Sequence, residues 1–170
     1  FLKARELVQS AAIGEPRFVE VMLTQPQKIA LAGQLPWRVR PEIAGGGIFV
    51  DLASHMLDYL DYVLGPVKQA YGFARNQAGA YPAEDIVSAA FEFESGIQAV
   101  GTWCFSSFES TDRITFVGSQ GKVSLSAFDA SPVLYETGEK REVFDISTPF
   151  HIQQPLIQQV VDELLGRGAC

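Results

Sequence analysis

The chain has 170 residues, enough for one folded domain with its own hydrophobic core. Hydrophobic residues make up 47% of it and charged residues 19%, which is the composition of an ordinary globular protein. Thirteen lysines and arginines against twenty aspartates and glutamates give a formal net charge of −7. This acidic balance argues against a nucleic-acid partner, because binding to the phosphates needs a cationic surface.

Only two cysteines occur, Cys104 inside an apolar run and Cys170 at the last position. Two isolated thiols form neither a disulfide framework nor a metal-ligand cluster, and they are typical of a reducing compartment. No apolar run approaches the roughly 20 residues that cross a bilayer. The sequence therefore predicts a cytoplasmic protein without a membrane-spanning segment.

The first quarter of the chain predicts a helix, a strand and a long loop. Residues 1–14 (FLKARELVQSAAIG) have helical periodicity and end at a glycine, and residues 16–24 (PRFVEVMLT) have strand character. Residues 25–47 contain three prolines and four glycines. Loops of this length are usually functional or disordered, and the aromatic and basic side chains of Trp37, Arg38 and Arg40 favour a functional loop.

Residues 48–64 predict an amphipathic helix that ends at Gly65-Pro66. Its apolar stripe comprises Leu52, Met56, Leu60, Val63 and Leu64. Another face carries polar and titratable groups at spacings of four, three and four, namely Asp51, His55, Asp58 and Tyr62. The helix therefore separates a packing face from a face that can do chemistry.

The second half predicts strands joined by short turns, followed by a helix over residues 151–165. The strand segments are residues 67–75, 85–94, 97–108, 112–118, 122–128, 133–136 and 141–146. Tight links between consecutive strands imply antiparallel pairing, since a parallel pair needs a long crossover. The predicted fold class is α+β: an open, mainly antiparallel sheet with helices packed on one face.

The two faces of this sheet are both partly apolar. In residues 97–105 the alternation places Trp103 on one face with other large apolar residues, while Val100, Thr102 and Cys104 lie on the opposite face. A sheet with one solvated face alternates more cleanly between apolar and polar residues. Two interpretations remain open: the second face is covered by another copy of the chain, or by the chain itself.

The segment from Gly45 to His55 (GGGIFVDLASH) combines a glycine triplet with an Asp/His pair. Glycines at a helix entrance let another backbone or a ligand approach the free N–H groups of the first turn. Asp51 and His55 are one turn apart, so the carboxylate can hold the imidazole as a proton acceptor for an alcohol. The alternative is that Asp51 merely stabilises the first turn and that His55 is a packing or surface residue.

The run GGGIFVDLASHMLDYLDYVLG, preceded by Trp37-Arg38, resembles the C-terminal domain of the Gfo/Idh/MocA oxidoreductases, and so does the opening FLKARELVQSAAIGEPRFVEV. The resemblance covers essentially the whole chain. It implies that His55 is the acid/base on the substrate hydroxyl and that Asp51 orients the substrate or the histidine. It also implies that Trp37 and Arg38 line the substrate. Gly46 and Gly47 are the glycines expected to contact the substrate.

Two parts of the family pattern are missing. No G-x-G-x-x-G fingerprint occurs, and no Glu-Lys-Pro whose lysine would reach the reacting oxygen. The run VGSQGKV has the wrong spacing for a phosphate loop and predicts a hairpin turn. We therefore expect residues 1–170 to be a single C-terminal domain fragment, truncated at both ends, with the Rossmann domain that holds NAD or NADP absent. The residue that selects NAD or NADP would lie in that domain.

The resemblance predicts the substrate-binding and oligomerisation half of an NAD(P)-dependent oxidoreductase that acts on a sugar, inositol or related polyol. The isolated chain is expected to be inactive, and a homo-oligomer is expected to form through the sheet. The alternative is a non-catalytic binding or assembly module in which the Asp/His pair is incidental. A metal site at Asp51, His55 and Asp58 lacks further His or Cys ligands, so no metal is expected.

Overall fold

The computed structural model describes residues 1–27, 34–147 and 149–168. The helical elements are α1 (Leu2–Gln9), the 3₁₀ turn η1 (Trp37–Val39), α2 (Pro41–Ala44), α3 (Ile48–Leu64) and α4 (Gln154–Leu164). The strands are β1 (Pro16–Thr24), β2 (Val67–Arg75), β3 (Ile86–Phe93), β4 (Gln98–Cys104), β5 (Thr111–Gly118), β6 (Gly121–Leu125), β7 (Val133–Thr137) and β8 (Arg141–Phe144).

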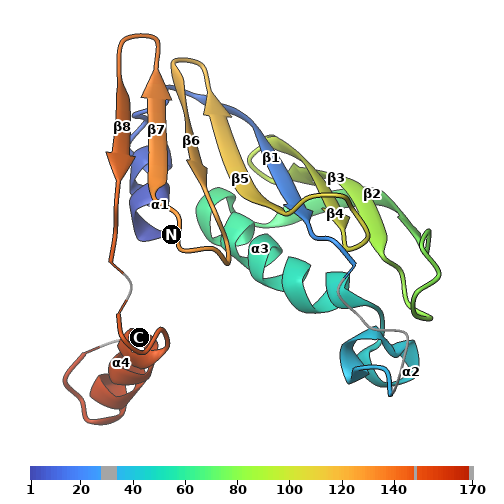
Figure 1. Ribbon diagram of the computed structural model, residues 1–170. Coiled ribbons are helices and arrows are strands. Elements are labelled where there is room, and N and C mark those ends of the chain that lie inside the picture. The colour runs from blue at the N-terminus through green and yellow to red at the C-terminus, as the bar shows by residue number, and fades with distance from the viewer. Residues whose placement is uncertain (28–33, 148, 169–170) are drawn as a thin grey trace.

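The strands form one eight-stranded sheet in the order β2-β3-β4-β1-β5-β6-β7-β8 (Figure 1). Two meanders, β2-β3-β4 and β5-β6-β7-β8, pair antiparallel as the short turns predict. Strand β1 lies between them, antiparallel to β5 and parallel to β4. The fold is therefore α+β with an open, mainly antiparallel sheet, and the one parallel pair among the described strands joins segments that are far apart in sequence.

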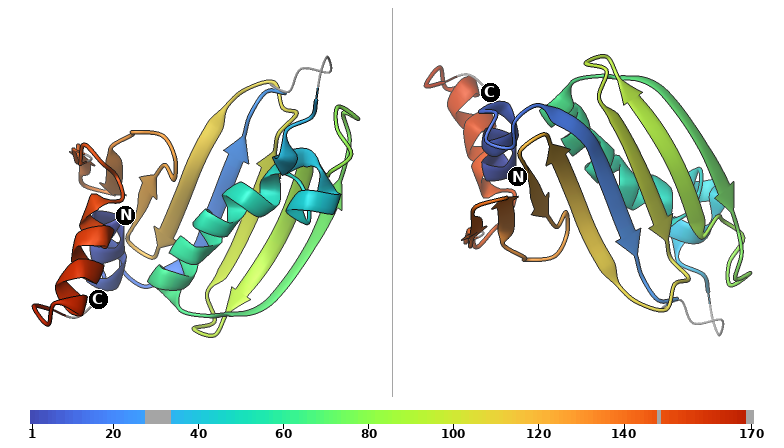
Figure 2. Two further views of the ribbon diagram at one scale, coloured as in Figure 1. Left: turned by 90° about the horizontal axis from the view of Figure 1, so that it is seen from below. Right: turned by 90° about the horizontal axis from the view of Figure 1, so that it is seen from above.

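Helix α3 crosses one face of the sheet and closes the core (Figure 2). Met56 and Leu60 have no exposed surface, and they share a single core cluster with Trp103, Phe93 and Phe116 from the sheet. The indole Nε1 of Trp103 donates a hydrogen bond to the Met56 sulfur at 3.4 Å. Each such buried side chain contributes roughly 1.5–3 kcal/mol to folding, so this contact fixes where α3 lies.

The opposite face of the sheet is open. Tyr71, Phe73 and Val100 are 74%, 86% and 52% exposed, while Trp103, on the other side of β4, is fully buried. The assignment of residues to the two faces is confirmed. Among the described residues no helix covers the open face, so the interpretation that the chain itself covers it is wrong for this part of the chain.

The two terminal helices are shorter than their patterns predict. Helix α1 ends at Gln9 because Ala11 (φ 58°) and Gly14 (φ 73°) take left-handed conformations. Helix α4 follows β8, lies away from the sheet and has no buried residue (Figure 1). In the described part of the chain, no helix has the length and apolarity to cross a bilayer.

Candidate active site

The glycine triplet builds the entrance of α3 by close packing. Gly45 ends α2 in the left-handed conformation at φ 78°, and Gly46 and Gly47 are buried. A Cβ on Gly47 would lie 2.5 Å from the backbone oxygen of Glu84, and the Gly47 N–H donates to the Glu84 carboxylate at 2.7 Å. The chain's own residue Glu84 therefore fills the space beside Gly46 and Gly47. The predicted contact between these glycines and a substrate stays a prediction.

The acidic pair Glu84-Asp85 has a structural role that its sequence does not suggest. Asp85 is only 2% exposed, although acidic residues are mostly found at the surface. Its carboxylate accepts N–H groups of Gln77 and Ala78, both at 2.8 Å. Glu84 supplies the acceptor at the start of α3, where the helix leaves backbone N–H groups unpaired.

The first turn of α3 carries an ion pair. Arg38 of η1 places its Nε 2.6 Å from a carboxylate oxygen of Asp51, and its guanidinium lies 5.3 Å from the Trp37 ring centre. Trp37, Arg38 and Asp51 therefore form one cluster, and the roles toward a substrate that the resemblance implies for them stay predictions. Within the described chain no hydrogen bond joins Asp51 to His55, so the acidic partner holds the arginine rather than the imidazole. The catalytic role of Asp51 stays a prediction.

His55 faces an open pocket. The pocket has a volume of about 540 Å³ and is lined by Phe1, His55, Asp58, Tyr59, Tyr62, Ala127, Phe128 and Ile152. Asp58 and Tyr62, which share a face of α3 with His55, line the same pocket. No cluster of three or more His, Cys, Asp or Glu side chains suited to a metal ion exists among the described residues.

Two tyrosines that line the pocket, Tyr59 and Tyr62, are held by residues at the N-terminal end of the chain. The Arg5 guanidinium stacks 3.9 Å from the Tyr62 ring centre and donates to the Tyr62 hydroxyl at 2.7 Å. The Tyr59 hydroxyl donates to the Phe1 backbone oxygen at 3.0 Å, and burial raises the pKa of Tyr59 well above its ordinary value. Tyr59 is therefore a neutral, fixed donor, and Tyr62 is the more accessible phenol.

The remaining wall comes from the β6–β7 loop and from Ile152, which precedes α4. The Phe128 ring lies 6.2 Å from the His55 ring at 81°, an edge-on contact. Sequence reasoning missed Phe1, Arg5 and Phe128 as site residues. No spacing rule connects α3 to residues 57 or 58 positions before their partners, as Arg5 and Phe1 are, or to a loop far along the chain, so only the folded chain brings them together.

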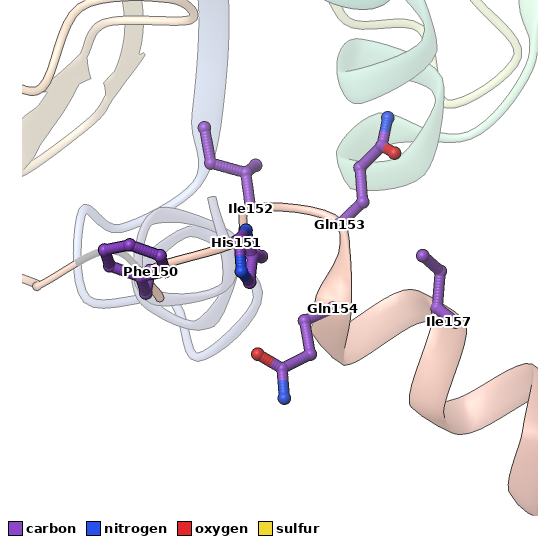
Figure 3. A pocket seen from close by; sticks show the side chains of 6 residues that line it. All are labelled: Phe150, His151, Ile152, Gln153, Gln154 and Ile157. Atoms are coloured by element: carbon purple, nitrogen blue, oxygen red, sulfur yellow. The ribbon is translucent and has the colours of Figure 1, made fainter.

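A larger hollow shares Ile152 with this pocket but has different chemistry. It has a volume of about 760 Å³ and is lined by near-consecutive residues from Phe150 to Ile157 at the start of α4. Their side chains point in different directions rather than toward a common centre (Figure 3). His151, just before α4, is exposed there. We therefore take the pocket of His55, where titratable groups converge, as the candidate active site.

Comparison with known proteins decides the family. The profile of the GFO/IDH/MocA C-terminal domain matches residues 1–124. The chain belongs to the GFO/IDH/MocA family. Oxidoreductase P35 of Formosa agariphila is 31% identical to this GFO/IDH/MocA chain over an alignment of 173 residues. The alignment covers 99% of the chain and 52% of that protein.

Solved structures support the same fold. The aldose-aldose oxidoreductase of Caulobacter crescentus, complexed with glycerol, superposes with a TM-score of 0.78 at 22% identity, covering 98% of this chain and 51% of that one. Levoglucosan dehydrogenase in complex with NADH and levoglucosan superposes with a TM-score of 0.79 at 15% identity, covering 98% of this chain and 54% of that one. At these identities the likeness shows the fold alone. The chain spans about half the length of each of these relatives.

Proposed function

We propose that residues 1–170 are the substrate-binding and oligomerisation half of an NAD(P)-dependent oxidoreductase. Its substrate would be a secondary alcohol on a sugar, inositol or related polyol. The observation that carries the proposal is the pocket of His55, in which an exposed imidazole, a carboxylate and a phenol share one hollow with aromatic rings. Family membership and the sugar bound to levoglucosan dehydrogenase support the reaction and substrate class.

In this proposal His55 accepts the proton of the reacting hydroxyl. Imidazole suits this task because it can gain and lose a proton near neutral pH. Asp58, on the next turn of α3, accepts a hydrogen bond from a neighbouring hydroxyl of the substrate. Asp51 fixes Arg38, and Arg38 with Trp37 offers a cationic and aromatic surface for the substrate.

The cofactor is assigned to the rest of the protein. In the described chain Gly46 and Gly47 pack against Glu84, and the glycine-containing turn between β5 and β6 is a tight hairpin, so neither offers a cradle for a pyrophosphate. A bound NAD or NADP supplies the hydride acceptor in reactions of this class. The isolated chain is accordingly proposed to be inactive.

The open sheet face is proposed as the contact between copies of the chain. Its large exposed side chains are Tyr71 and Phe73 of β2 and Val100 of β4, which lie on one side of the sheet with Ala90 of β3 between Tyr71 and Val100. Contiguous apolar surface of this kind is costly in a monomer and typical of a symmetric interface. In light scattering of the full-length protein, Phe73→Glu should lower the mass of the assembly.

The test of the catalytic proposal is the turnover of full-length His55→Ala and His55→Gln with NAD⁺ and NADP⁺ and a panel of sugars and polyols. Loss of the proton acceptor should lower kcat/KM by roughly 10²- to 10⁴-fold. Asp61→Asn, an exposed carboxylate on the same helix, is the control and should leave turnover unchanged. Normal turnover of correctly folded His55 variants would instead support a non-catalytic binding or assembly module.

A further inference from the structure

Asp112, near the start of β5, holds the loop that follows β6. Its carboxylate accepts the backbone N–H groups of three consecutive residues, Ala127 at 2.9 Å, Phe128 at 2.7 Å and Asp129 at 2.9 Å. The Ser126 hydroxyl adds a fourth bond, to the Asp112 backbone oxygen at 2.9 Å. Hydrogen bonds to an ionised carboxylate are roughly twice as strong as neutral ones, so this loop is firmly anchored.

The anchored loop forms one wall of the candidate active site. Ala127 and Phe128 both line the pocket of His55, and the Phe128 ring meets the His55 ring edge-on at 6.2 Å. Phe128 is 43% exposed, so part of its ring remains free for a ligand. A rigid apolar wall beside a proton acceptor is the arrangement that orients a substrate in a pocket.

We propose that Phe128 is a specificity-determining wall of this pocket and that Asp112 is the positioning residue that fixes it. The inference rests on the proposed function and narrows its substrate class to cyclic polyols and sugars in ring form. Such a molecule has a C–H face that packs on the phenyl ring while a ring hydroxyl reaches His55. An open-chain polyol lacks a flat apolar face and gains less from Phe128.

The kinetic test uses the full-length protein with myo-inositol and D-glucose as ring substrates and sorbitol as the open-chain probe. Phe128→Leu should raise KM for the ring substrates roughly 5- to 10-fold, because one aromatic contact is lost. The change in kcat, and the change in KM for sorbitol, should be smaller. Asp112→Asn, which keeps one carbonyl oxygen, should change KM in the same direction by less. Glu109→Gln, an exposed carboxylate three residues before Asp112, should change nothing.

A second measurement is independent of activity. In full-length protein with ¹³C-labelled histidine, the ring signal of His55, assigned with His55→Gln, should carry a ring-current shift from Phe128. Phe128→Leu and Asp112→Ala should both move that signal, and Asp112→Asn serves if the alanine variant fails to fold.

The outcomes separate the two proposals. An unmoved His55 signal in folded Asp112 variants, or equal KM changes for ring and open-chain substrates, would overturn the role of Asp112 and Phe128. A moved signal together with normal turnover of His55→Ala would instead overturn the proposed function, while leaving the placement of Phe128 by Asp112 intact.

Discussion

The two faces of helix α3 differ in what they contact, although their residues are interspersed along one continuous segment. The inward face is at most 7% exposed and comprises Ala53, Met56, Leu60 and Val63. The outward face lines the pocket and carries His55, Asp58 and Tyr62. Burial against the sheet fixes the helix, and this leaves the other face free for groups that would be costly to bury. Stability and chemistry should therefore respond to different substitutions.

The largest expected effect on stability is that of Leu60→Ala, which leaves a cavity beneath the sheet. Truncation of a fully buried leucine should lower the free energy of unfolding by about 2–5 kcal/mol. On the outward face His55→Ala removes an exposed side chain and should change it by no more than about 0.5 kcal/mol. Urea unfolding of both variants measures the difference. Equal losses of unfolding free energy in Leu60→Ala and His55→Ala would contradict the separation of α3 into a stabilising face and a pocket-lining face.

Gly47→Ala should have an intermediate effect, because its new methyl group would meet the Glu84 backbone oxygen. Overpacking at such a site costs about 1–3 kcal/mol. Gly45→Ala is the matched control: nothing lies near its Cβ, and only its left-handed backbone, worth about 1–2 kcal/mol, opposes the change. Gly45→Asn should recover part of that loss, whereas Gly47→Asn should not. The denaturation midpoints of the four variants test whether packing or backbone conformation dominates at the helix entrance.

The smallest expected effect is a gain from Tyr81→Phe, in the small core beside η1 formed with Val39 and Ala83. The Tyr81 hydroxyl is buried and has no hydrogen-bond partner among the described residues, so its removal should raise stability by about 1 kcal/mol. Burial, reinforced by the negative charges of Asp85 and Glu84, raises the pKa of Tyr81 to about 12.

The raised pKa of Tyr81 makes the stability of the folded chain fall at high pH. Since the unfolded chain ionises near pH 10, it binds fewer protons than the folded chain between pH 10 and 12, and wild-type stability should fall in that window. Tyr81→Phe should lack this part of the fall, so its advantage over the wild type grows with pH. A constant difference between the two proteins from pH 9 to 11.5 would contradict the assignment.

Local patterns in the sequence predict the elements and the faces well. The bounds of α3 agree with the predicted residues 48–64, because apolar periodicity, the preceding glycines and Gly65-Pro66 all act within one helix. The alternation in β4 correctly separates Trp103 from Val100. The parallel pairing of β1 with β4 was not predicted, since it joins strands separated by more than 70 residues and leaves no local signal.

The candidate site was predicted in part. The grouping of His55, Asp58 and Tyr62 follows from helical spacing, whereas Trp37 and Arg38, which the family resemblance adds, do not line the pocket of His55. The Asp51–Arg38 ion pair was not predicted from spacing, because the nearer partner in sequence, His55, is not the partner that the fold presents. The Asp112 anchor is also invisible in the sequence, where an aspartate at the start of a strand is usually solvated.

By itself the sequence determined the helices and strands, the apolar stripe of α3 and the polar face that carries His55, because these depend on contacts between residues a few positions apart. Only the tertiary structure decided what faces His55. Phe1, Tyr59 and Phe128 reach one pocket from three different elements, held by Asp112 and by the packing of α3 on the sheet. The physical reason is that the wall of a site is set by long-range packing and hydrogen bonds, and these have no fixed spacing along the chain.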